Sequence, residues 1–222
     1  MKTSSSPHAA LFLIAVLAAF APPALAEEKT EALYEATLDL DRDGKMDRAV
    51  LVLVGPGRTD FHPLTEERYG LSPGERVDLN IYLAGGEEKL DLSRKPSFAK
   101  KAIADTDRTP WVQPLESDGD GSLAVTSVYG WGASKTWGET LTIAYRDGEF
   151  VVADYAKDWD WNTHTADGNV ETVIGGCEID FLAGKGVVTQ GLDEENQPIE
   201  GTFTPVKLAD WTGDNLPEAC EF

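Results

Sequence analysis

Apolar and polar residues alternate along much of the chain after residue 26, and Gly or Asp stands where the alternation stops. A period of two is typical of a strand that has one face on the core and the other toward solvent. Residues 77–83 are a clear example, and the following Gly85 and Gly86 predict a turn that leads toward Leu90 and Leu92. The pattern therefore predicts antiparallel strands joined by short turns.

The most definite hairpin is predicted at residues 141–155. Its centre is Asp147-Gly148, a pair that readily adopts the positive φ angles of a type I′ turn. A second hairpin is predicted within residues 177–188, and residues 122–129 form a further strand.

Helix is scarce in the predicted fold. Residues 98–105, with Ser97 as a possible N-cap, form the one modest candidate. Residues 55–76 are a long polar connection of a length that often carries function. The fold class predicted is all-β, a single domain of antiparallel hairpins arranged as a sandwich or a curled meander.

The first 26 residues have the layout of a cleavable signal peptide. Lys2 precedes an apolar run at residues 9–21, and Ala24 and Ala26 occupy the two positions that signal peptidase reads. The apolar run is shorter than the roughly 20 residues that a membrane span needs. We therefore expect a periplasmic or secreted protein with no membrane span after cleavage, in which residues 27–222 form one acidic, β-rich domain.

The charge of the chain excludes some partners. The formal net charge is −20 for all 222 residues, and it becomes −21 once Lys2 is removed. Such a surface repels nucleic acid and anionic lipid and attracts cations and basic partners. The acidic residues are spread along the chain, as expected of a solvated surface.

Two cysteines, Cys177 and Cys220, stand 43 positions apart in the predicted mature chain. An even number of cysteines in an exported protein predicts a disulfide. The pair lacks Cys-x-x-Cys spacing, so we expect a structural bond that fastens the C-terminal tail.

Residues 39–47, called the acidic loop below, carry the most specific chemical signal in the chain. Calcium takes six to eight oxygen ligands, and alternate residues of a tight turn can supply them. Gly44 permits the sharp bend, and an ordinary solvated turn without an ion is the alternative. The predicted ligands are the carboxylates of Asp39, Asp41, Asp43 and Asp47 and the backbone carbonyl of Lys45.

The acidic loop resembles the calcium loops of FG-GAP and VCBS-type repeats, in which spaced acidic residues and a Gly precede an apolar strand. It differs from an EF-hand because Val50 stands where a bidentate Glu is required. Residues 145–152 and 182–185 are also similar to a family of exported, β-rich bacterial proteins that carry one such loop. The first resemblance implies an adhesive, extracellular or scaffolding protein, and the second brings no activity with it. We expect a calcium ion at this loop to be structural.

Four tryptophans, Trp131, Trp137, Trp159 and Trp161, flank the predicted 141–155 hairpin and are expected to meet at one end of the sheet. We favour a role in covering the core, because Trp has a large apolar area. The alternative is a surface that binds a glycan or a protein.

The sequence lacks the motifs of the common enzyme classes. The favoured hypothesis is an exported, non-catalytic, calcium-stabilised β protein that binds an unknown cell-envelope protein or glycan. The alternative is a glycan or peptidoglycan hydrolase that uses Asp158 or Asp160 beside the tryptophans.

Overall fold

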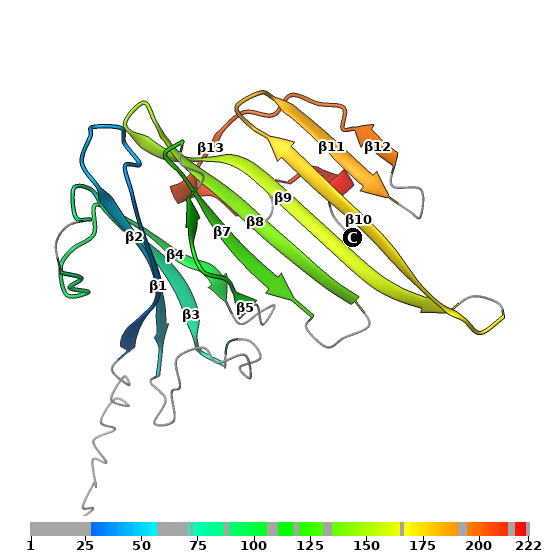
Figure 1. Ribbon diagram of the computed structural model, residues 1–222, viewed down its shortest axis with the longest axis horizontal. Helices are drawn as coiled ribbons and strands as arrows, with labels where there is room; N and C mark the ends of the chain where they lie inside the picture. Colours follow the sequence, from blue (N-terminus) through cyan, green and yellow to red (C-terminus); the bar gives the residue numbers. More distant parts are fainter. Residues whose placement is uncertain are drawn as a thin grey trace, which may run out of the picture.

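The structure is a computed structural model, drawn in Figure 1. It describes residues 28–56, 71, 73–86, 89–105, 111–117, 120–130, 135–164, 167–190, 195–212 and 216–220. Within these residues the fold is all-β, with single-turn 3-10 helices as its sole helical elements, so the predicted fold class is confirmed. The predicted signal peptide, residues 1–26, lies outside the described residues.

The small sheet has four antiparallel strands in the order β1-β2-β3-β4. The inner strand β2 is buried on both faces, because Leu51 packs into the main core while Val52 on the opposite face packs with Tyr82. Leu90 and Leu92, toward which the predicted Gly85-Gly86 turn leads, also cover that second face and form no strand. The strands are β1 (Lys29–Leu38), β2 (Asp47–Gly55), β3 (Arg76–Tyr82) and β4 (Phe98–Asp105).

The helix predicted at residues 98–105 is wrong, because this segment is strand β4. Its Ala and Lys residues favour helix locally, but pairing with β3 overrides that preference. The register of the pair shifts between Val77 and Leu79, and Ala102 on β4 has a φ of 49°. Ser97 accepts a hydrogen bond from the Leu83 amide and caps no helix.

The large sheet has the order β12-β11-β10-β9-β8-β7-β5, with β13 paired to β9 and β6 paired to β7. The predicted hairpin at residues 141–155 is confirmed as part of β8 and β9, with Asp147 at φ 52° and Gly148 at φ 85° in the turn. The hairpin predicted within residues 177–188 is likewise present. The elements are β5 (Trp111–Val112), β6 (Glu116–Ser117), β7 (Ser122–Tyr129), β8 (Lys135–Arg146), β9 (Glu149–His164), β10 (Val170–Asp180), β11 (Lys185–Gln190), β12 (Glu195–Pro198), β13 (Val206–Lys207), η1 (Leu208–Asp210) and η3 (Glu218–Cys220).

One hydrophobic core joins the two sheets. Leu51 and Leu79 of the small sheet belong to the same buried cluster as Ile143 of the large sheet. Across the junction, the rings of Phe98 on β4 and Phe150 on β9 lie 5.1 Å apart. The two sheets therefore stabilise each other as layers of a sandwich.

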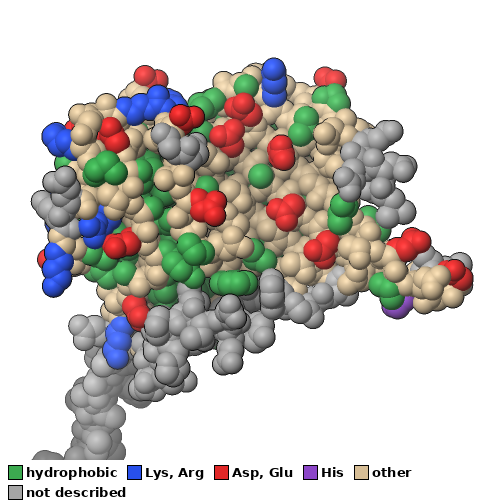
Figure 2. All heavy atoms as spheres, in the orientation of Figure 1, with side chains coloured by type: hydrophobic (Ala, Val, Ile, Leu, Met, Phe, Trp, Pro, Cys, Tyr) green, Lys and Arg blue, Asp and Glu red, His purple; other side chains and the backbone are tan. Residues whose placement is uncertain are grey.

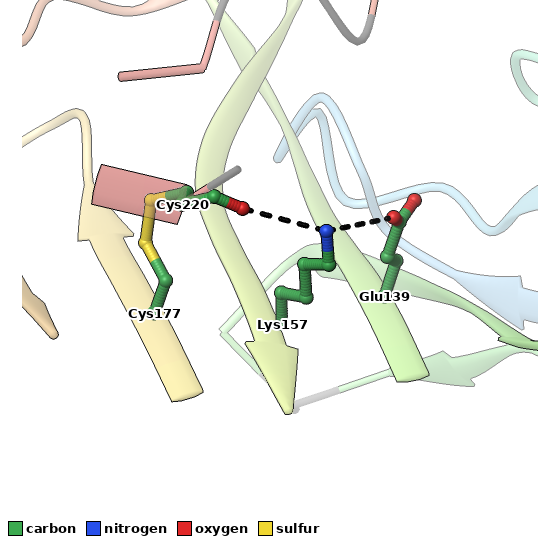
Figure 3. The surroundings of a disulfide bond; sticks show 4 residues. All are labelled: Glu139, Lys157, Cys177 and Cys220. Carbon is green, nitrogen blue, oxygen red and sulfur yellow. Dashed lines mark hydrogen bonds and ion pairs between the residues drawn. A yellow bond between two sulfur atoms is a disulfide. The ribbon is translucent and has the colours of Figure 1, made fainter. Parts of the chain in front are cut away.

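The C-terminal segment packs against this core and ends at a disulfide between Cys177 on β10 and Cys220 on η3, whose Cα atoms are 5.4 Å apart. The two sulfur-bearing side chains are fully buried. Beside them, Lys157 on β9 reaches the carbonyl oxygen of Cys220 at 3.4 Å and the carboxylate of Glu139 at 3.7 Å (Figure 3). This arrangement, called the C-terminal closure below, fastens the tail to the inner face of the large sheet.

Strands β9 and β10 extend as a hairpin beyond the rest of the large sheet (Figure 1). On the face shown in Figure 2, acidic side chains spread over the large sheet while Lys and Arg gather over the small one. Among the described residues, no helix is long and apolar enough to cross a membrane.

Candidate functional site

The acidic loop connects β1 to β2 and folds back on itself through its own carboxylates. The Asp43 amide donates to Asp41 Oδ1 at 3.1 Å, the Lys45 amide donates to Asp43 Oδ1 at 2.8 Å, and the Gly44 amide donates to Asp39 Oδ2 at 3.0 Å. Gly44 has a φ of 84°, which a residue with a Cβ rarely adopts. As a result, one oxygen atom from each of Asp39, Asp41 and Asp43 lies within 4.8 Å of the others.

The Oδ1 atom of Asp39 is buried and has no hydrogen-bond partner within the protein. A buried carboxylate oxygen without a partner is unfavourable, because it has lost water and gained nothing in return. A hard cation would satisfy it. The three carboxylates could hold such an ion, because hard cations take oxygen ligands.

Asp47 is a predicted ligand, but the structure does not bring it into this carboxylate group. Its side chain is fully buried and accepts hydrogen bonds from the amides of Leu40 at 2.8 Å, Asp41 at 3.4 Å and Ala84 at 2.6 Å. Burial raises the pKa of Asp47, and the amides of Ala84 and Leu40 act in the opposite direction. Asp47 therefore holds both ends of the acidic loop in position.

Lys45, whose backbone carbonyl is a predicted ligand, also places its ammonium 2.9 Å from Asp43 Oδ2. The hydrogen bond from Lys45 lowers the pKa of Asp43, and the same pairing raises the pKa of Lys45. Both side chains are exposed. A metal ion at this loop would therefore compete with an ammonium group that is exposed to solvent.

The acidic loop also contacts the large sheet. The Arg42 guanidinium donates a hydrogen bond to the carbonyl oxygen of Asp120, just before β7. A groove of about 530 Å³ lies between the two segments, with Asp39 and Met46 on one side and Ser117 and Gly121 on the other.

The four tryptophans expected to meet at one end of the sheet, called the aromatic cluster below, differ in their surroundings because of the strand register of the large sheet. Trp137 on β8 and Trp159 on β9 are directly opposite each other, and Trp137 stacks on Tyr129 with ring centroids 5.1 Å apart and planes at 8°. Trp159 is 6% exposed and covers Gly175, where a Cβ would lie 2.2 Å from its ring. Trp159 is therefore part of the packed interior. Trp131 lies outside the described residues.

Trp161 differs from its neighbours because it is 38% exposed. The Lys135 ammonium lies 5.3 Å from the centroid of its ring, which is a cation–π distance. Among the three tryptophans that the structure describes, Trp161 is thus the most accessible to a ligand, and the half-buried Trp137 lies two residues along the neighbouring strand from Lys135.

Asp158 and Asp160, the acids of the hydrolase alternative, face away from Trp159 and Trp161, because successive residues of β9 point to opposite faces. The Asp158 carboxylate lies over Gly138 of β8, with Oδ1 3.1 Å from the position of a Cβ there. Desolvation by the surrounding protein raises the pKa of Asp158, and the charge of Asp160 adds to this effect. These carboxylates therefore do not share a surface with Trp159 and Trp161.

Several residues of these sites carry no local sequence signal of their role. Tyr129, Lys135 and Arg42 acquire their partners through strand register or contact between the sheets. Gly175 and Gly121 are the exceptions, since a Gly within or beside a strand can mark a close approach. No family model, curated protein or solved structure matches the chain.

Proposed function

We propose that this chain is an exported, non-catalytic β protein that is stabilised by one calcium ion and binds a protein or glycan of the cell envelope. The observation that carries the proposal is the convergence of the Asp39, Asp41 and Asp43 oxygens within 4.8 Å, together with the buried, unpartnered Oδ1 of Asp39. Signal-peptide features in residues 1–26 and the Cys177–Cys220 disulfide support export.

The ion would be held by the carboxylates of Asp39, Asp41 and Asp43, with the Lys45 carbonyl as a further oxygen. This set fits the resemblance to FG-GAP and VCBS-type loops. Asp47 would support the site by holding the loop ends, since both of its oxygens already accept amide hydrogen bonds. Binding would relieve the repulsion among three carboxylates and release the Lys45 ammonium, so the ion would be structural.

We propose that the partner binds at the exposed side chain of Trp161. It combines an exposed apolar ring with a cation at Lys135, which suits stacking on a sugar or an aromatic side chain. We do not propose the hydrolase alternative, because Asp158 and Asp160 lie on the face of β9 opposite to Trp161.

Thermal unfolding of the mature protein in EDTA and in 10 mM calcium tests the calcium proposal. A site with a Kd on the order of 10⁻⁴ M gains about 2.7 kcal/mol at this concentration. For a chain of this size the gain corresponds to a rise of roughly 5–10 °C in Tm.

The variant Asp41→Asn, Asp43→Asn should lose most of this rise. The matched control is Asp158→Asn, Asp160→Asn, which removes the same amount of charge from the large sheet. This control should keep the calcium-dependent rise in Tm. Equal calcium responses in both variants would refute a site at the acidic loop.

A further inference from the structure

The acidic loop contacts the large sheet through Arg42, a residue with an unusual backbone conformation. Arg42 has a φ of 61°, in the left-handed region that residues other than Gly seldom adopt. In that conformation its guanidinium donates to the Asp120 carbonyl oxygen. The contact joins a residue between two members of the carboxylate group, Asp41 and Asp43, to the turn that leads into β7.

Two glycines allow backbone from both sheets to close around the loop. A Cβ on Gly121, which precedes β7, would lie 2.9 Å from the carbonyl oxygen of Asp39. On the other side, a Cβ on Gly86 would lie 2.6 Å from the Cβ of Met46, and the Gly86 amide donates to the Met46 carbonyl at 2.8 Å. The acidic loop is therefore clamped between the turn after β3 and the start of β7.

Asp39 belongs to both the carboxylate group and the contact between the sheets. Its carboxylate is one of the three that converge, its carbonyl oxygen faces Gly121, and its side chain lines the groove of about 530 Å³. Asp39 thus connects the carboxylate group directly to the groove.

We propose that the acidic loop is a calcium-dependent latch between the two sheets, in which the ion fixes Asp39 and Arg42 and thereby orders the start of β7 and the groove beside it. The inference rests on the proposed calcium site and adds the part of the fold that the ion regulates. Without the ion, repulsion among the carboxylates loosens the loop and releases the Arg42 contact. By thermodynamic reciprocity, the Arg42 contact must in turn raise the affinity of the loop for calcium by the same factor.

Hydrogen exchange of the mature protein, with and without 5 mM calcium, tests the latch. In the wild type, calcium should slow exchange both at residues 39–47 and at residues 121–125. In Arg42→Ala, calcium should still slow exchange in the loop but no longer at residues 121–125, and calorimetry should show calcium affinity reduced about five-fold, the low end of ordinary coupling. If the Ala variant folds poorly, Arg42→Gln keeps most of the side chain and serves instead. In it, too, calcium should slow exchange in the loop but not at residues 121–125.

The matched control is Arg76→Ala, which removes a guanidinium from the opposite end of the small sheet, where it pairs with Glu28 and Asp78. It should leave both calcium effects as in the wild type. Calcium protection of residues 121–125 that persists in Arg42→Ala, with calcium still bound, would overturn the latch and leave the calcium site intact. Absence of calcium binding by the wild type in calorimetry would instead overturn the proposed function, and the latch with it.

Discussion

The acidic loop and the C-terminal closure both fasten parts of this sandwich, but they use different chemistry. The acidic loop spans nine residues, 39–47, and holds its shape through carboxylate–amide hydrogen bonds, most of them exposed to solvent. The closure joins residues 43 positions apart by a covalent bond whose two cysteines are fully buried. A polar loop responds to ions and protons, whereas a buried covalent bond does not. The closure should therefore provide constant stability, and the loop should provide stability that depends on conditions.

Removal of the disulfide should have the largest effect. Closing a loop of 43 residues lowers the entropy of the unfolded chain, which corresponds to about 4 kcal/mol of stability in the chain-entropy model. Cys177→Ala, Cys220→Ala should therefore lower the free energy of unfolding in urea by about that amount, and by the same amount in EDTA and in calcium. A loss that differs between the two conditions would show that the two fastenings are coupled.

The second effect concerns Asp47, the one fully buried carboxylate of the acidic loop. Asp47→Asn keeps the shape but turns an amide group toward the backbone amides of Leu40 and Ala84, which need acceptors. Leaving such a donor unsatisfied costs about 1–3 kcal/mol. Urea unfolding in EDTA should show this loss, and the isosteric control Asp160→Asn should not. A near-zero change would mean that Asp47 contributes to the site through calcium alone.

Sequence reasoning succeeded where the signal is local. Asp147-Gly148 predicts the turn of β8 and β9 because the turn itself demands positive φ, and the spacing of the acidic residues brings Asp39, Asp41 and Asp43 together within one bend. It failed at β4, where helix-favouring residues are overridden by pairing with β3. Pairing partners and relative register are long-range properties that no single segment encodes.

The same limit explains the aromatic cluster and the role of Asp47. Asp158 and Trp159 are adjacent in sequence, yet they lie on opposite faces of β9, and Gly175 admits the Trp159 ring from a different strand. Asp47 matches a ligand position in the sequence pattern, but its carboxylate faces the amide of Ala84, which is 37 residues away. A pattern identifies the residue type that a site needs, whereas the partners of each residue follow from the folded chain.

The smallest predicted effect tests whether a carboxylate outside both fastenings also makes stability depend on pH. The pKa of Asp158 is raised in the folded state, so the folded protein holds this proton more tightly than the unfolded chain. Ionisation of Asp158 therefore lowers stability as the pH rises from the usual value of 3.8 through the raised pKa. Asp158→Asn should have the same free energy of unfolding as the wild type at pH 3 and a higher one by pH 7. The gain should stay below about 1 kcal/mol, because solvent screens this exposed carboxylate.

The measurement is urea unfolding in EDTA at several pH values, and the background variant Asp160→Asn separates the two causes of the raised pKa. Because desolvation is the larger cause, the pH-dependent gain of Asp158→Asn should shrink but persist when Asp160 is neutral. Complete loss of the gain in that background would make charge repulsion the dominant cause. A gain that appears equally at pH 3 would exclude titration of Asp158 as its cause.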